Sequence, residues 1–164
     1  MPTLIIMRHA KSVDRMEAED DFERGLTARG HSDADDAAAA MKRAGLRAGL
    51  ALVSPARRTR ETWKHLVDVL GDPPVQDPMA LYHATHDMLI RAVIAAINEG
   101  AEDIVLVGHN PGIGALVHGL ADSCGEVGDL PYGWPTSAAA AFTVQTEDGL
   151  LTASKRLMVF DPKA

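Results

Sequence analysis

Residues 3–10 read TLIIMRHA, an apolar run that stops abruptly at an arginine and a histidine. An apolar run without polar alternation is typical of a strand that is buried on both faces of a sheet. Two later segments share this design, since residues 50–54 read LALVS and residues 104–109 read IVLVGH. The sequence therefore predicts three buried strands, each followed directly by small or polar residues.

Amphipathic segments separate these strands. In the first, Ala34, Ala37, Ala38 and Met41 recur at helical spacing, and Thr27 can cap the helix. The first predicted helix runs to about Arg43, and the other three carry their apolar positions within residues 63–70, 89–97 and 113–120. The second and fourth begin near Ser54 and Asn110, and the first three stop at Gly45, Gly71 and Gly100. Strands that alternate with helices predict an α/β fold with a largely parallel sheet.

Three shorter features complete the predicted sheet. A short strand is expected among the prolines of residues 73–78. Residues 138–144 and 151–160 look like two further strands, and Asp148-Gly149 between them is a turn signal. We expect this pair to form an antiparallel edge.

Length, charge and cysteine content limit the classes of function. The 164 residues suit one domain that spans residues 1–164. The formal net charge of -7 argues against nucleic acid or an anionic membrane as the main partner. No segment approaches the ~18 continuous apolar residues that a membrane helix needs. The single cysteine, Cys124, fits a reducing compartment, so we expect a cytoplasmic protein.

The residues that follow the three strands are expected to meet in one crevice, because ligands of open α/β sheets bind outside the carboxyl ends of the strands. That crevice would collect Arg8, His9, His109 and an arginine from residues 57–58. The guanidinium fork of arginine matches phosphate oxygens, and a neutral imidazole is a competent nucleophile toward phosphorus. No metal cage is evident in the sequence, so we expect phosphoryl transfer without a metal ion or another cofactor.

The three motifs together resemble those of the histidine phosphatase superfamily, which includes the phosphoglycerate mutases. Residues 8–10 (RHA) are similar to its Arg-His-Gly signature, with alanine in place of the usual glycine. Residues 54–62 (SPARRTRET) are similar to its Ser-Pro-x-x-Arg-Ala-x-x-Thr segment, and residues 108–111 (GHNP) to its second histidine motif.

This resemblance implies both a fold and a set of roles. The fold is a three-layer sandwich, in which helices cover both faces of a mostly parallel central sheet. His9 would be the nucleophile that carries a covalent phosphoryl group. Arg8, Arg58 and His109 would hold that group, and the motif alignment selects Arg58 rather than Arg57.

Residues 8–12 (RHAKS) and 21–30 (DFERGLTARG) look like the short, SixA-type phosphohistidine phosphatases of this superfamily. A glycine replaces the proline that we would expect after Arg24. By this resemblance Arg24 reaches the rim of the pocket. Lys11 and Asn110 are candidate substrate-binding residues, for which solvent exposure or loop capping is the alternative.

Larger relatives place a general-acid carboxylate after the strand that corresponds to the short one expected among residues 73–78. Here the residues that follow, 80–86, read ALYHATH and contain no carboxylate. An alcohol is a poor leaving group that needs a proton donor, but the imidazole of a phosphohistidine is a much weaker base. We therefore expect the chain to hydrolyse phosphohistidine on a protein and to release inorganic phosphate. The alternatives are a small-molecule phosphomonoesterase of the same superfamily and a non-catalytic phosphate-binding module.

Two segments have two interpretations each. The acidic residues 13–25 form either a solvated loop or a loop that borders the active site or docks a partner. His83, His86 and Asp87 could suggest a metal site or a proton donor. We favour a loop that leads into a helix, capped by Thr85 or Asp87, because no third strong ligand is nearby.

Overall fold

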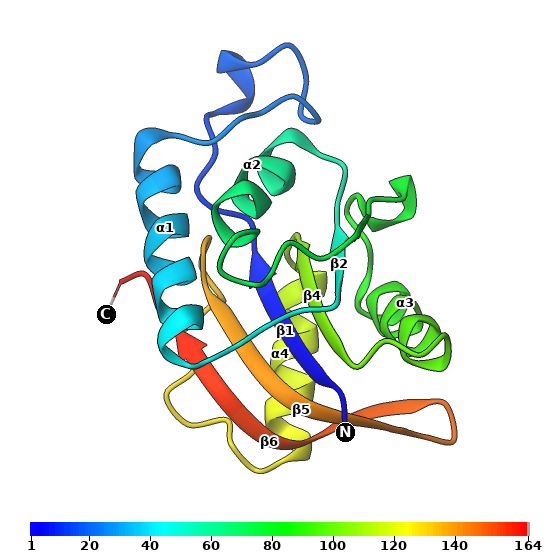
Figure 1. Ribbon diagram of the computed structural model, residues 1–164. Coiled ribbons are helices and arrows are strands. Elements are labelled where there is room, and N and C mark those ends of the chain that lie inside the picture. Colours follow the sequence, from blue (N-terminus) through cyan, green and yellow to red (C-terminus); the bar gives the residue numbers. More distant parts are fainter. Residues whose placement is uncertain (164) are drawn as a thin grey trace.

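A six-stranded sheet with helices on both faces makes up the computed structural model, which describes residues 1–163 (Figure 1). The strands are β1 (Thr3–Arg8), β2 (Leu50–Val53), β3 (Val75–Gln76), β4 (Asp103–Gly108), β5 (Ala139–Glu147) and β6 (Leu150–Phe160). The α-helices are α1 (Ala28–Arg43), α2 (Arg57–Leu66), α3 (His86–Asn98) and α4 (Gly112–Ser123), with short 3-10 helices at Arg15–Glu17 and Met79–Leu81. No helix among these residues is long and apolar enough to cross a bilayer.

The strand order is β3-β2-β4-β1-β5-β6. Strands β3, β2, β4 and β1 are mutually parallel, and β5 is antiparallel to both of its neighbours, β1 and β6. The mostly parallel sheet of the sequence-based prediction is therefore confirmed. The register of β1 and β4 pairs Arg8 with Gly108, and the amide of His9 donates to the Gly108 carbonyl at 3.0 Å. This register places the residues that follow both strands side by side.

Alternation along β1 divides the core between the two faces of the sheet. Leu4 and Ile6 belong to one apolar cluster, together with side chains of α3 and α4. Ile5 and Met7 belong to the other, together with side chains of α1 and α2. All four are fully buried, which is why the strand reads as an unbroken apolar run. The three layers are those that the sequence predicts.

Helix α1 begins where the sequence predicts, since the Thr27 hydroxyl accepts a hydrogen bond from the Gly30 amide. Gly30 lies against the loop after β1, because a Cβ atom there would come within 2.2 Å of the Lys11 carbonyl oxygen. Helix α2 begins near the predicted start but ends earlier than predicted. It begins at Arg57 and ends at Leu66, and the chain then forms turns as far as Gly71.

Candidate active site

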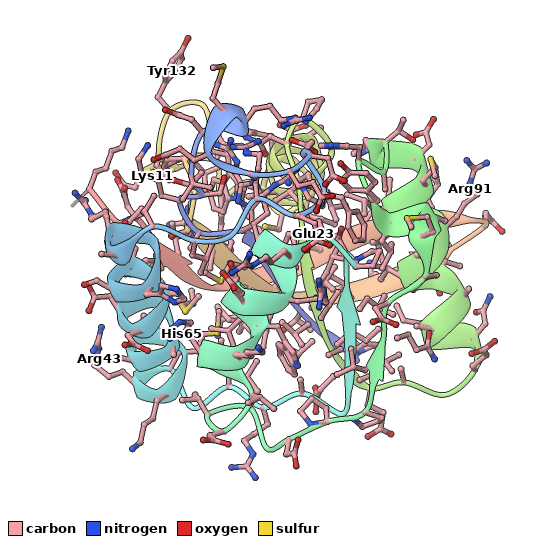
Figure 2. All side chains as sticks on the ribbon, turned by 90° about the horizontal axis from the view of Figure 1, so that it is seen from above. Lys11, Glu23, Arg43, His65, Arg91 and Tyr132 are labelled. Atoms are coloured by element: carbon pink, nitrogen blue, oxygen red, sulfur yellow. The ribbon has the colours of Figure 1, made fainter. Side chains whose placement is uncertain are left out.

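The carboxyl ends of β1, β2 and β4 surround a cavity of about 290 Å³. Figure 2 shows the molecule from this end, with Lys11 close to α1. All seven residues that the sequence singled out line the cavity, together with five others: Arg8, His9, Lys11, Ser12, Asp14, Asp21, Arg24, Arg58, His83, His109, Asn110 and Thr136.

His9 is held in one tautomer by its own backbone. Its Nδ1 lies 2.8 Å from the carbonyl oxygen of Ala10. A carbonyl only accepts hydrogen bonds, so Nδ1 carries the ring proton and Nε2 carries the lone pair. The main chain is fixed as well, because the Ala10 amide donates to Thr62 Oγ1 at 2.9 Å and the Ser137 amide donates to the His9 carbonyl at 3.0 Å.

Burial is the main cause that lowers the pKa of His9 to about 3, and the nearby guanidinium groups of Arg58 and Arg8 lower it further. The hydrogen bond to the Ala10 carbonyl acts in the opposite direction but does not outweigh them. The ring is therefore neutral at physiological pH, and its Nε2 can form a bond to an electrophile.

His109 lies next to His9, with ring centroids 5.4 Å apart. Its Nε2 is 2.7 Å from the hydroxyl of Ser54, which is the first residue after β2. Its Nδ1 is buried and has no hydrogen-bond partner within residues 1–163. Burial, followed by the charges of protonated His9 and of Arg58, lowers the pKa of His109 to about 2, so this ring is also neutral.

Arg58 is the most deeply buried cation of the cavity, with only 2% of its surface exposed. Its guanidinium donates to the backbone carbonyl of Asp21 at 2.8 Å and to the Asp21 carboxylate at 3.1 Å. Arg57 points elsewhere and pairs with Glu61 at 2.9 Å on the exposed side of α2. The structure thus places Arg58 in the cavity and Arg57 outside it.

Arg8 and Arg24 complete the set of guanidinium groups. Arg8 donates from one terminal nitrogen to the Trp134 carbonyl at 3.1 Å. Arg24 donates to the Val13 carbonyl at 2.8 Å and to the Ser12 hydroxyl at 2.8 Å. Despite the glycine that follows it, Arg24 therefore lies in the cavity, next to the loop that carries His9.

Asp21 is the residue that the sequence reasoning missed. Its carboxylate accepts hydrogen bonds from Arg58, from Arg24 at 2.9 Å and from the Tyr82 hydroxyl, and it lies 3.2 Å from His83 Nε2. Burial alone would raise the pKa of Asp21, but the hydrogen bonds from Tyr82 and Arg24 outweigh it and hold that pKa well below its ordinary value. The carboxylate is therefore ionised.

Asp21 decides between the two interpretations of the acidic run, because this part of it borders the cavity. It also corrects the inference from residues 80–86. A carboxylate is present in the cavity, but it comes from the loop before α1 rather than from the segment after β3. Tyr82 and His83 form the wall beside it, and the His83 ring packs against His109 with centroids 4.7 Å apart.

The remaining candidates have less central positions. Lys11 is exposed at the rim. The Asn110 amide donates to the Gly133 and Trp134 carbonyls, and its oxygen accepts from the Gly114 amide at 3.0 Å, so this side chain joins two segments of the wall.

His83 lines the cavity, but His86 and Asp87, the other members of the suggested metal site, do not. Thr85 caps α3 by accepting from the Met88 amide, and His86 lies against Asp87 at 3.3 Å. Across residues 1–163 no group of three or more His, Cys, Asp or Glu side chains is arranged to hold a metal ion.

Comparisons with known proteins agree with this geometry. The family model of the histidine phosphatase superfamily (branch 1) matches residues 4–80. SixA from Agrobacterium tumefaciens has 27% identity and a TM-score of 0.77, over 87% of this chain and 92% of that one. The protein histidine phosphatase SixA complexed with tungstate has 27% identity and a TM-score of 0.76, over 94% and 96%. The chain is therefore similar to the histidine phosphatase superfamily, over residues 4–80 by the family model and over most of its length by these two solved structures.

These similarities indicate a phosphatase, an enzyme that acts on a phosphorylated substrate and releases phosphate. A more distant structure, the SixA protein from Nakamurella multipartitia, has 22% identity and a TM-score of 0.73, and supports the fold alone. A search of the curated proteins finds no match.

Proposed function

We propose that this protein hydrolyses phosphohistidine on proteins, through a phosphoryl group carried covalently by His9. The observation that supports it best is the fixed tautomer of His9. Nδ1 donates a hydrogen bond to the Ala10 carbonyl at 2.8 Å, and burial keeps the ring neutral, so Nε2 has a lone pair with which to attack phosphorus.

In the first step Nε2 of His9 forms a bond to phosphorus, and the bond between phosphorus and the substrate imidazole breaks. The second ring nitrogen of the substrate takes a proton from the solvent before the bond breaks, so the imidazole departs neutral without a proton from the enzyme. Arg8, Arg24 and Arg58 supply donors for the equatorial oxygens of the transferring group. Water then attacks the phosphorus of phospho-His9, which releases phosphate and restores the neutral ring.

His109 adds a donor to the same group when the Ser54 hydroxyl donates to its Nε2, because the ring proton then lies on Nδ1. That nitrogen is buried without a partner in residues 1–163, as a donor reserved for a ligand would be. The arginines and this histidine neutralise charge that a metal ion neutralises in other phosphoryl-transfer sites. We therefore propose that catalysis needs no metal.

The state of Asp21 supports a phosphoramidate rather than an ester as substrate. An alkoxide leaving group needs a proton from the enzyme. Asp21 is ionised and bound to two arginines, so it has no proton to give. An imidazole leaving group needs none. The preference for a phosphoramidate therefore follows from the ionised state of Asp21, not from the absence of a carboxylate in the cavity.

One observation favours the second candidate, a small-molecule phosphomonoesterase. His83 is half exposed and its Nε2 lies 3.2 Å from the Asp21 carboxylate. A protonated His83 held by this carboxylate would be a proton donor for an alcohol. In that case His83→Gln would reduce turnover of phosphate esters and leave phosphohistidine turnover unchanged.

A turnover assay separates these proposals. Wild-type protein, His9→Ala and the exposed control Arg57→Gln are tested on a phosphohistidine protein and on a panel of phosphate esters, with and without a chelator. We expect turnover of phosphohistidine by wild type and Arg57→Gln, none by His9→Ala, and no effect of the chelator. Wild-type turnover of esters alone would favour the phosphomonoesterase, and phosphate binding without turnover would favour a binding module. The cytoplasmic location stays a prediction.

A further inference from the structure

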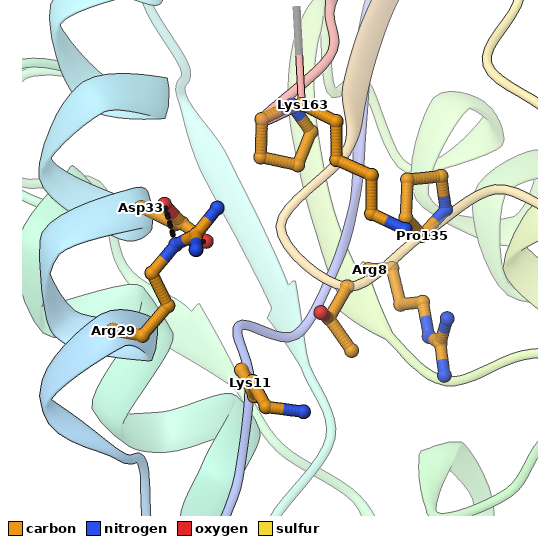
Figure 3. A pocket seen from close by; sticks show the side chains of 8 residues that line it. Arg8, Lys11, Arg29, Asp33, Pro135 and Lys163 are labelled. Atoms are coloured by element: carbon orange, nitrogen blue, oxygen red, sulfur yellow. Dashed lines mark hydrogen bonds and ion pairs between the residues drawn. The ribbon is translucent and has the colours of Figure 1, made fainter.

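A second cavity, of about 600 Å³, adjoins the active site. The two cavities share Arg8, Lys11 and Thr136 in their walls. The second one continues from these residues to Arg29 on α1 and to Lys163 near the end of the chain. In Figure 3, Lys11 and Lys163 enter it from opposite ends, between α1 and the loop at Pro135.

Its walls carry an excess of positive charge. Four cations line the cavity, namely Arg8, Lys11, Arg29 and Lys163, against one carboxylate, Asp33, which is paired with Arg29 at 3.0 Å. The chain as a whole has a net charge of -7, so a cationic surface here opposes the overall sign. An anionic ligand would experience a local attraction here despite the negative net charge of the whole chain.

Three of these cations have no carboxylate partner in the structure. None of the ion pairs in residues 1–163 involves Arg8, Lys11 or Lys163. Arg8 stands between the two cavities, and its Nε is buried without a hydrogen-bond partner among these residues. Burial and the neighbouring Arg58 lower the pKa of Arg8, as expected for a cation whose charge nothing nearby compensates.

We propose that this second cavity binds acidic side chains of the substrate protein, next to the phosphohistidine that enters the active site. The inference rests on the proposed function, because it assumes that the phosphoryl group is displayed on a polypeptide. Carboxylates that flank a phosphohistidine could reach Lys11 and Lys163 while the phosphoryl group contacts His9, since the two cavities are neighbours that share Arg8, Lys11 and Thr136 in their walls.

The size of the cavity favours a polypeptide segment over a free ion. A water molecule accounts for about 30 Å³ of liquid volume, so a single phosphate ion would fill only a small part of 600 Å³. Its cations also stand on separate elements, since Lys11 follows β1, Arg29 lies in α1 and Lys163 follows β6. Several carboxylates on one segment match such a spread better than one compact ion does.

Two phosphohistidine peptides provide the test, with flanking glutamates in one and glutamines in the other. We expect wild type to process the glutamate peptide with roughly fivefold higher kcat/KM at low ionic strength, as a few exposed ion pairs would give. Added salt should reduce this preference. Lys163→Met should weaken it and Lys163→Glu should abolish or reverse it. Lys64→Glu, the same charge change at an exposed position of α2, should retain it.

Affinity of the unphosphorylated peptides gives a readout that does not depend on turnover. Tighter binding of the glutamate peptide by wild type, lost in Lys163→Glu, supports the acidic subsite even if neither peptide is hydrolysed, an outcome that would defeat the proposed function alone. Equal preference in Lys163→Glu and Lys64→Glu overturns the inference. So does a calorimetric titration with inorganic phosphate that finds a second, Lys163-dependent site in the absence of any preference for glutamate.

Discussion

Keeping His9 neutral inside the fold has a cost that appears as acid lability. The folded pKa of His9 is about 3, against an ordinary value of 6.5. Between these two pH values the unfolded chain binds a proton that the folded chain does not. The free energy of unfolding therefore falls as pH falls through this window, and the full stability is present only above about pH 6.5.

The magnitude follows from the width of the window. Each pH unit below the ordinary pKa removes about 1.36 kcal/mol, so lowering the pH to about 5 removes about 2 kcal/mol through His9 alone. His109, with a pKa lowered to about 2, adds a similar loss. Over the same fall in pH, the free energy of unfolding should decrease by about 2 kcal/mol less in a variant that lacks the His9 ring than in wild type.

Urea unfolding of wild type and His9→Asn, at about pH 7 and about pH 5 in phosphate-free buffer, measures this difference. The asparagine amide can still donate to the Ala10 carbonyl, so the loop is preserved. His118→Asn, at an exposed position of α4, is the matched control and should follow wild type. Equal acid sensitivity of His9→Asn and wild type would refute the argument that the fold holds His9 neutral.

Other substitutions test the rest of the cavity. Arg58→Gln should lower kcat/KM by about 100-fold or more because a buried donor to the phosphoryl group is lost, whereas the exposed Arg57→Gln should stay within about twofold of wild type in the same assay. Asp21→Asn should lower kcat about tenfold with the fold intact by circular dichroism, because the carboxylate orients Arg58. Gly30→Ala should lower the free energy of unfolding by about 3 kcal/mol in urea, because its Cβ would overlap the Lys11 carbonyl.

Sequence alone predicted the parts of the site that follow strands. His9 and His109 come directly after β1 and β4, two apolar runs, and parallel pairing in register brings their backbones together. Arg58 is in the cavity because it lies in the first turn of α2, five residues after Val53, where β2 ends at the same edge of the sheet. The strand ends follow from apolar patterns in the sequence, whereas the choice of Arg58 over Arg57 came from the resemblance to the family motif.

The residues that prediction missed come from irregular segments. Asp21 and Tyr82 are 61 positions apart and are joined by a hydrogen bond between loops, which no periodic pattern encodes. The placement of β5 was also hidden. It lies beside β1 inside the sheet, so that of these last two strands only β6 is at an edge, because the pairing of a strand depends on tertiary contacts rather than on its own composition. Lys163, which follows β6, reaches the second cavity because of where this strand lies in the sheet.

Phosphorylation of Nε2 of His9 is the central claim, and rapid-quench analysis of the reacting enzyme tests it most directly. Protein mixed with a phosphohistidine substrate is quenched in alkali, digested and analysed by mass spectrometry, while phosphorus NMR of the denatured enzyme distinguishes the two ring positions. The account predicts a phosphoryl group on Nε2 of His9, present during turnover and absent in His9→Asn. A phosphoryl group on Nδ1, on His109 or on His83, or turnover without any phosphoenzyme, would contradict it.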